Sequence, residues 1–141
     1  MKNLKLGIIA IFLLILFSCS GEAKNDGSND RKVVKRISSA EKKIDAVLVE
    51  VYGGATVANS HRVYIVLHGN EILSSDYAIF IADYTIGTDI EFSPNNILSI
   101  KYDKARIFSF TNFWHSEKLD DWKYIVEVKL VNTSSDGKAL K

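Results

Sequence analysis

Short runs of β-branched, aliphatic and aromatic residues follow one another along most of the chain, and Gly, Asn, Asp or Pro stands between them. Such residues are favoured in strands, and turn residues between short apolar runs are typical of strand ends. The runs are residues 45–52, 62–68, 78–84, 89–92, 97–102, 106–111 and 122–131. No window of ten or more residues after Ile44 shows a helical stripe, so the pattern predicts about seven or eight short strands.

Alternation within these runs predicts their surroundings. In residues 97–102, Leu98 and Ile100 share a face opposite Ser99 and Lys101, and alternate positions from Trp122 to Leu130 are also apolar. Strands with one polar face are typical of antiparallel sheets that face water on one side. The run 45–52 is apolar on nearly both faces, so we expect it to lie centrally. Together the runs predict an all-β domain, a compact antiparallel sandwich or a small barrel.

Residues 31–43 allow two interpretations. Val33, Ile37, Ala40 and Ile44 recur at helical spacing, which suggests a short amphipathic helix. The same segment also fits a strand over residues 33–38, followed by a turn over residues 39–43. The strand is favoured because every later run is β-like.

The stretch from Asp103 to His115 carries three local predictions. A tight hairpin at Asp103-Lys104 is expected to join the runs 97–102 and 106–111. Phe108 and Phe110 are expected to face the core from one side of a strand. Phe113 and Trp114 follow the point where alternation breaks, and they either close the end of the sandwich as a lid, which we favour, or form an exposed recognition anchor.

The chain begins with a different pattern. Lys2 and Lys5 precede an unbroken apolar run from Ile8 to Phe17. As a helix this run would cover about 16 Å, roughly half of the hydrocarbon core of a bilayer. A short apolar run behind a positive start is typical of a secretory signal peptide rather than of a membrane span.

The end of this run, Leu16-Phe17-Ser18-Cys19, resembles the lipobox of bacterial lipoproteins. The resemblance implies cleavage before Cys19 and a diacylglycerol on its thiol; the alternative is a plain secretory signal with an incidental Cys19. Ser20 follows the cysteine where Asp would resemble an inner-membrane retention signal. We therefore expect an anchor in the outer membrane facing the periplasm, or on the outer face of the plasma membrane of a one-membrane bacterium.

These patterns divide the chain into four parts. We expect a lipoprotein signal peptide at residues 1–18, the lipidated Cys19 with a polar tether at residues 19–30, the β-domain at residues 31–132 and a polar tail at residues 133–141. The tether is rich in Gly, Ser and Asn, a composition typical of flexible linkers.

Composition excludes several classes of protein. The chain has 18 Lys+Arg and 17 Asp+Glu, a balance that excludes nucleic-acid binding through overall basicity. Hydrophobic residues make up 47%, too many for a disordered chain, and one Cys cannot form an internal disulfide. A local basic stretch, Arg31 to Arg36 with Lys42 and Lys43 after it, either contacts anionic headgroups near the anchor or, as we favour, is simply solvated.

The sequence predicts no enzyme, cofactor or metal site. His61, His68 and His115 form no closely spaced pair of the kind that zinc sites use, and no Gly-x-Ser-x-Gly nucleophile motif is present. Asp83, Asp89 and Glu91 would lie near one another if their strands were neighbours, but acids on the wet face of a sheet do this without a catalytic role.

Two groups of residues remain as candidates for binding a partner protein. The first is Gly53, Gly54 and His61, around the loop after the run 45–52. The second is Phe113, Trp114 and Trp122. The sequence therefore predicts a membrane-anchored accessory or structural protein of the envelope that acts by binding. The alternative is an inhibitor or immunity-type lipoprotein that blocks a periplasmic enzyme, a toxin or a phage.

A second resemblance concerns the β-domain. The run DAVLVEVYGGATV from Asp45, the segment VYIV from Val63 and YDKARIF from Tyr102 are similar to those of small bacterial envelope proteins of uncharacterised function. In these proteins a valine-rich strand leads into GGAT and a V-Y-I-V strand. The resemblance implies a β fold and supplies no catalytic residue.

Overall fold

The structure is a computed structural model that describes residues 30–134 as nine strands and one 3-10 turn. The predicted signal peptide, Cys19 and most of the tether and tail lie outside the described residues. The elements are β1 (Arg31–Ser38), β2 (Ile44–Val51), β3 (Ser60–Leu67), β4 (Phe80–Ile86), β5 (Asp89–Phe92), β6 (Ile97–Tyr102), β7 (Lys104–Phe110), β8 (Phe113–His115), η2 (Asp120–Trp122) and β9 (Ile125–Asn132).

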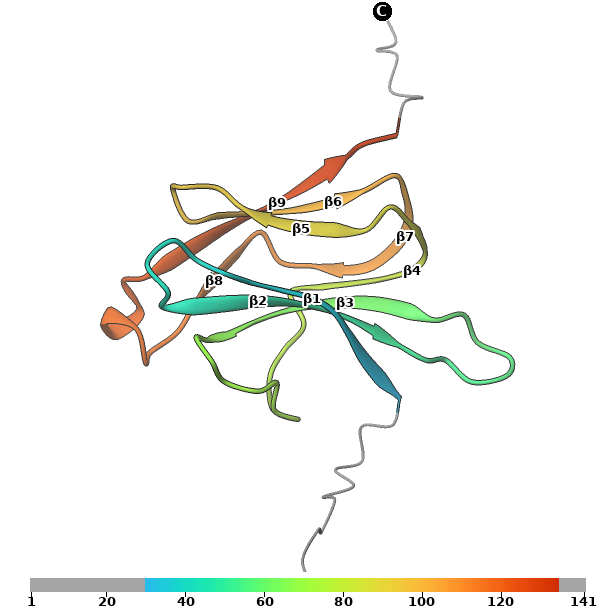
Figure 1. Cartoon of the computed structure of the whole chain (residues 1–141), viewed down its shortest axis with the longest axis horizontal. Coiled ribbons are helices and arrows are strands. Elements are labelled where there is room, and N and C mark those ends of the chain that lie inside the picture. Colours follow the sequence, from blue (N-terminus) through green and yellow to red (C-terminus); the bar gives the residue numbers. More distant parts are fainter. Residues whose placement is uncertain (1–29, 135–141) are drawn as a thin grey trace, which may run out of the picture.

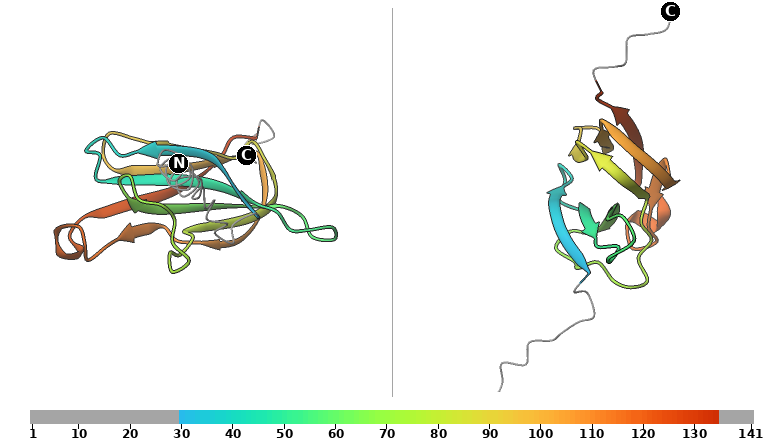
Figure 2. Two further views of the ribbon diagram at one scale, coloured as in Figure 1. Left: turned by 60° about the horizontal axis from the view of Figure 1, so that its bottom comes forward. Right: turned by 90° about the vertical axis from the view of Figure 1, so that its right-hand side faces the viewer.

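The strands form two sheets that pack face to face (Figures 1 and 2). One sheet has the order β1-β2-β3-β4-β7 and the other the order β5-β6-β9-β8. The predicted all-β sandwich is therefore confirmed, and the barrel alternative is wrong because the sheets do not close. The expectation of purely antiparallel pairing is wrong at one place, since β6 and β9 are parallel. Alternation of apolar and polar residues shows that one face of a strand is exposed to solvent, but it does not show whether the neighbouring strand runs parallel or antiparallel.

The strand interpretation of residues 31–43 is confirmed, and the helix interpretation is wrong. β1 pairs with β2 in antiparallel register from Arg31↔Val51 to Ser38↔Asp45. The turn between them is closed by Ser39, whose N–H donates to the carbonyl of Ile44 (2.9 Å) and whose hydroxyl accepts the N–H of Lys43 (3.2 Å). A side chain that hydrogen-bonds the local backbone favours a turn over a helix.

The core lies between the sheets, and the central position of the run 45–52 is confirmed. β2 lies between β1 and β3, and Ile44, Ala46 and Leu48 face the inner core with no exposed surface. The other face of β2 is also covered. Its Val47 and Val49 form a second cluster with Tyr64 and Val66 of β3, against which Ile72 and Ala78 pack. The β3–β4 connection (residues 68–79) therefore shields the outer face of the five-stranded sheet.

The predicted hairpin at Asp103-Lys104 is wrong. β6 pairs with β5 and β9, whereas β7 pairs with β4, so the chain crosses from one sheet to the other at Asp103. The N–H of Asp103 donates to the carbonyl of Ile86 across this corner (2.8 Å). A tight connection fits both a hairpin and a change of sheet, and here β6 already has a neighbour on each side.

Phe108 is not a core residue, and this prediction is also corrected. The register of β4 with β7 shifts between Ile81↔Ser109 and Ala82↔Ile107, so Phe108 occupies a β-bulge. Its side chain is 60% exposed, while Ile107 and Phe110 pack against the core. Because the bulge adds one residue to β7, Phe108 does not share the core-facing side of the strand with Phe110, as strict alternation had predicted.

Trp122 does not belong to the last strand, although Tyr124, Val126 and Val128 are buried as predicted. β9 begins at Ile125, and Trp122 ends η2 with a φ of 69°. Two acidic residues before it also have positive φ, and such a backbone cannot continue a strand. Residues 120–122 form a single 3-10 turn instead.

Candidate functional site

A groove of about 540 Å³ opens at one end of the sandwich. One wall is residues 65–67 of β3, and a second is the β3–β4 connection between Asn70 and Ile79. The third is the β8–η2 segment (residues 113–122), which contributes β8, residues 116–118 and Trp122. Ligand sites in proteins typically have volumes of roughly 300–1,000 Å³, so the groove has the size of a binding site.

Exposed apolar side chains gather at this groove. Of its lining residues, Leu73 is 59% exposed, Tyr77 91%, Phe113 48% and Trp122 49%. The ring of His115 lies between two of them, with its centroid 5.5 Å from that of Phe113 and 4.9 Å from that of Trp122. Large apolar groups that converge on one concavity mark an interaction site more clearly than isolated ones do.

β8 explains why neighbouring aromatic residues have different surroundings. The strand pairs with β9 through Phe113↔Glu127, Trp114↔Val126 and His115↔Ile125. Side chains alternate along it, so Trp114 packs against the core while Phe113 and His115 lie on the other face. Trp114 has the position expected of a lid, and Phe113 and Trp122 have the exposure that a recognition anchor requires.

The groove carries more acidic than basic groups. Glu71, Asp76 and Glu117 line it, against a single Lys118. The side chain of Glu71 is 89% exposed, whereas Asp76 accepts the N–H of Leu73 (2.7 Å) and so shapes the turn within the β3–β4 connection. The side chains that line the groove therefore carry a net negative charge, although Glu71 also lies 3.8 Å from Arg36 Nη2, which does not line it.

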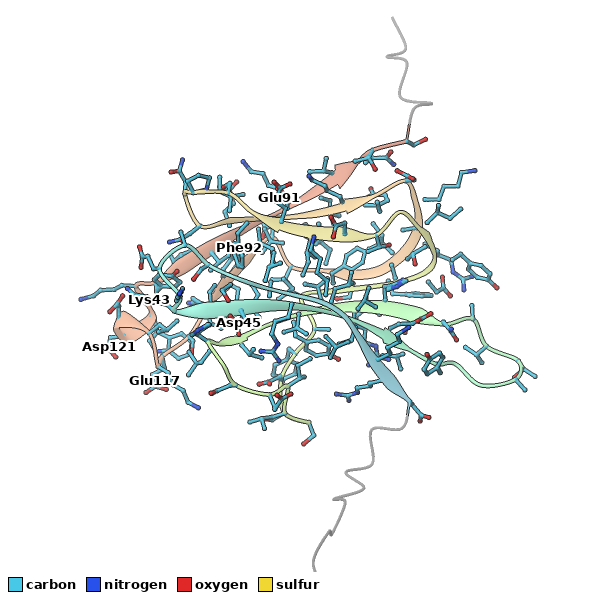
Figure 3. The ribbon with its side chains drawn as sticks, viewed as in Figure 1. Lys43, Asp45, Glu91, Phe92, Glu117 and Asp121 are labelled. Atoms are coloured by element: carbon cyan, nitrogen blue, oxygen red, sulfur yellow. The ribbon has the colours of Figure 1, made fainter. Side chains whose placement is uncertain are left out.

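The beginning of the β3–β4 connection is held by the buried carboxylate of Asp45 on β2, which Figure 3 labels. Asp45 is 2% exposed and accepts hydrogen bonds from Gly69 N–H (3.0 Å), His68 Nδ1 (2.7 Å) and Arg36 Nη1 (3.0 Å). Arg36 also donates to the carbonyl of Asn70 (3.0 Å). One carboxylate thus fixes the first residues of the groove wall to β1 and β2.

Hydrogen bonding determines the charge state of Asp45. Burial by itself raises the pKa of this carboxyl, but the hydrogen bonds from Gly69, His68, Ser38 and Arg36 outweigh burial and hold the pKa well below its usual value. The sequence analysis missed this residue. An acid in a run that is apolar on nearly both faces was the available signal, but its partners stand 9, 23 and 24 residues away.

The other group of predicted binding residues lies away from the groove. Gly53 and Gly54 begin the β2–β3 loop (residues 52–59), which projects at the right of Figure 1, whereas β8 and η2 lie at the left. His61 follows at the start of β3, where its Nδ1 is hydrogen-bonded to Thr85 Oγ1, and burial lowers its pKa. The two predicted groups therefore do not form one surface, and whether either binds a partner stays a prediction.

The loop favours glycine at both positions 53 and 54, for different reasons. A Cβ on Gly53 would lie 2.5 Å from the carbonyl oxygen of Val57 and 2.6 Å from that of Ala58. Gly54 has open space around it but a φ of 81°. The close approach at Gly53 involves backbone atoms, which cannot move without moving the loop.

We expect Gly53→Ala to lower the free energy of unfolding by about 2–3 kcal/mol, because the methyl group forces the loop apart. Gly54→Ala is the matched control and should cost only about 1 kcal/mol, because its strain is confined to one φ angle. Urea unfolding measures both. A larger loss in Gly54→Ala would contradict the tight packing at Gly53.

Ion pairs account for much of the basic stretch and for the acids considered for catalysis. Lys35 Nζ lies 2.6 Å from Asp89 and links the edge strands β1 and β5 of the two sheets. Lys43 contacts Asp120, the first residue of η2 (3.2 Å), next to the labelled Asp121 in Figure 3. Hydrogen bonds from Arg106, Lys35 and Lys101 lower the pKa values of three carboxyls, respectively Asp83, Asp89 and Glu91. Each of these three carboxylates is therefore paired with a cation of its own.

Within residues 30–134, no three His, Cys, Asp or Glu side chains lie close enough together to hold a metal ion, and no helix is long and apolar enough to cross a bilayer. Comparison with known proteins adds no assignment. No protein-family model matches the chain, and no match is found among curated proteins or solved structures.

Proposed function

We propose that this protein is a lipid-anchored component of the bacterial cell envelope whose β-domain binds a partner protein in the groove. The observation that carries the proposal is the convergence of Leu73, Tyr77, Phe113 and Trp122 on one concavity. Trp and Tyr dominate the binding energy of protein interfaces, and an apolar centre with a charged border is the usual anatomy of such sites.

The N-terminal pattern supports a position at the membrane. The apolar run that ends at Cys19 resembles a lipoprotein signal, and the polar residues 20–30 separate it from β1. A linker of eleven such residues spans roughly 17–20 Å on average. The proposed partner is therefore an envelope protein that lies close to the same membrane.

The proposed role is binding and not catalysis. The carboxylates considered for acid–base chemistry have cationic partners, a pairing that supports a structural role for them. The groove itself offers apolar and acidic side chains, Lys118 and one histidine, whose ring packs against Phe113 and Trp122. These groups suit recognition of an apolar segment.

Site-specific photo-crosslinking of the full-length protein in its own envelope tests the proposal. A benzophenone amino acid at Tyr77 should crosslink one discrete protein, and the same group at Tyr84 should not. Tyr84 is a matched control because it is also an exposed tyrosine, 66% exposed, that does not line the groove.

Trp122→Ala should weaken the crosslink from Tyr77 about 30-fold or more, since truncation of a tryptophan at a hot spot costs about 2 kcal/mol or more. Equal crosslinks from both tyrosines, or a crosslink that Trp122→Ala leaves unchanged, would refute binding in the groove. The identity of the captured protein separates the two roles. An enzyme that loses activity on binding indicates the inhibitor alternative, and assembly components indicate the accessory role.

A further inference from the structure

Among the strands of residues 30–134, none covers one strand edge in the groove. β3 pairs with β2 along its whole length, from Ser60 to Leu67. It pairs with β4 only from Ser60 to Val63, and beyond this point the N–H of Ile79 donates to the carbonyl of Val63 (2.8 Å). The half of β3 that follows Val63 therefore has no strand beside it on the side away from β2, and the groove occupies this place.

The register shows which backbone groups face the groove. His68 N–H donates to the carbonyl of Lys43 (3.0 Å), so the even-numbered residues of β3 direct their backbone groups toward β2. The odd-numbered residues direct theirs away from β2, as the contact of Val63 with Ile79 confirms. Ile65, a groove residue, therefore presents its N–H and C=O on the side where the register with β4 has ended.

This edge is unusual because it lies at a largely buried residue. Ile65 is 4% exposed, and buried backbone groups in folded proteins are nearly always paired. The neighbouring Leu67 has its carbonyl engaged by the N–H of Asn70 (2.9 Å). An extended peptide that entered the groove would supply a donor and an acceptor to Ile65 and continue the sheet.

The side chains around this edge indicate the chemistry of such a peptide. Alternate residues of an added strand point to opposite faces, so apolar residues at every second position would meet the apolar rim. The acidic excess of the lining, Glu71, Asp76 and Glu117 against Lys118, favours lysine or arginine at the positions between. An acidic peptide would be repelled.

We propose that the partner places an extended segment in the groove as an added strand on β3, hydrogen-bonded to Ile65, and that this segment alternates apolar residues with lysine or arginine. This inference rests on the proposed function, because it specifies how the same groove binds. A second copy of this chain, or a partner that uses side-chain contacts alone, is an outcome that the test below distinguishes.

The test uses the protein as the cell makes it, purified in detergent, and a display library of random seven-residue peptides. We expect selected peptides to alternate apolar and basic residues and to bind about 30-fold more weakly to Trp122→Ala than to Tyr84→Ala. Hydrogen exchange followed by NMR should show the Ile65 amide slowed at least tenfold by peptide. The Tyr64 amide, which already faces β2, serves as the internal control and should not change.

N-methylation of the selected peptide supplies the second measurement. Methyl groups on the alternate amides that face β3 should abolish binding, and methyl groups on the amides between them should leave it intact. Peptides that need Trp122 but neither slow Ile65 exchange nor respond to N-methylation would overturn the added strand and leave groove binding standing.

The remaining outcomes also decide between the claims. A failure to select peptides, or selection of acidic ones, would overturn the inference, while the photo-crosslink from Tyr77 tests the proposed function independently. Self-association that protects Ile65 without peptide would identify a second copy of this chain as the occupant and would likewise overturn it.

Discussion

Replacement of Asp45 by alanine is expected to lower the free energy of unfolding by about 3 kcal/mol, because removal of one partner from a buried ion pair leaves the others without an acceptor. The side chain of Asp45 is 3% exposed, and Arg36, His68 and Gly69 all donate to it. Arg36 is 29% exposed and regains water in part, so the cost lies at the lower end of the range for buried pairs.

The same residue predicts a dependence on pH. The pKa of Asp45 is lower in the folded protein than in the unfolded chain, so the folded state binds this proton less readily. The stabilisation is therefore fully present above the unfolded pKa of about 3.9 and is lost as the pH falls below about 4, toward the folded pKa. We expect Asp45→Asn to flatten the acid side of the stability curve.

Urea unfolding between pH 3 and pH 7 measures both effects. Asp121→Asn is the matched control, since Asp121 is exposed and Asn tolerates its φ of 55°. Asp83, Asp89 and Glu91 also have lowered pKa values, so some acid sensitivity should remain in Asp45→Asn. If Asp45→Asn and Asp121→Asn had the same stability at pH 7, Asp45 would not hold the β3–β4 connection.

Replacement of Cys19 by serine is expected to abolish lipidation of the protein, because a hydroxyl does not replace the thiol to which the proposed diacylglycerol is attached. Each buried CH₂ contributes about 0.8 kcal/mol to membrane affinity, so two acyl chains give a nearly permanent anchor. The serine variant should therefore leave the detergent-rich phase in a phase-partition experiment.

The N-terminal peptide mass and the partition of the protein measure this result. Ser18→Ala is the matched control, because it keeps a small residue before the cysteine and should remain lipidated. An unmodified thiol at Cys19 in the unaltered protein, or a serine variant that partitions as before, would contradict the proposed anchor. The fold of residues 30–134 would be unaffected by either outcome.

Local patterns in the sequence determined which segments are strands. The predicted runs 89–92 and 97–102 coincide with β5 and β6, and the strand and turn in residues 31–43 are present. These features depend on the strand and turn propensities of residues that are close together in the sequence. The burial of Leu98 and Ile100, opposite the half-buried Ser99 and Lys101, follows from the same alternation.

Tertiary structure decided everything that depends on pairing between distant segments. Phe108 is exposed because the register of β7 with β4 shifts by one residue at this point. Trp122 is exposed because it and the two residues before it have positive φ and lie outside β9. Neither fact has a signature in hydrophobicity. The direction of β9 beside β6 was equally invisible in the alternation of either strand.

The groove shows the same division. Sequence analysis selected Phe113, Trp114 and Trp122 because aromatic residues followed a break in alternation, but it did not find Leu73, Tyr77 or Asp45. These residues matter because the β3–β4 connection folds back across β2 and ends opposite β8. Alternation reports which side of a strand is buried, whereas the free edge of β3 and the groove beside it exist only once separate segments of chain have met.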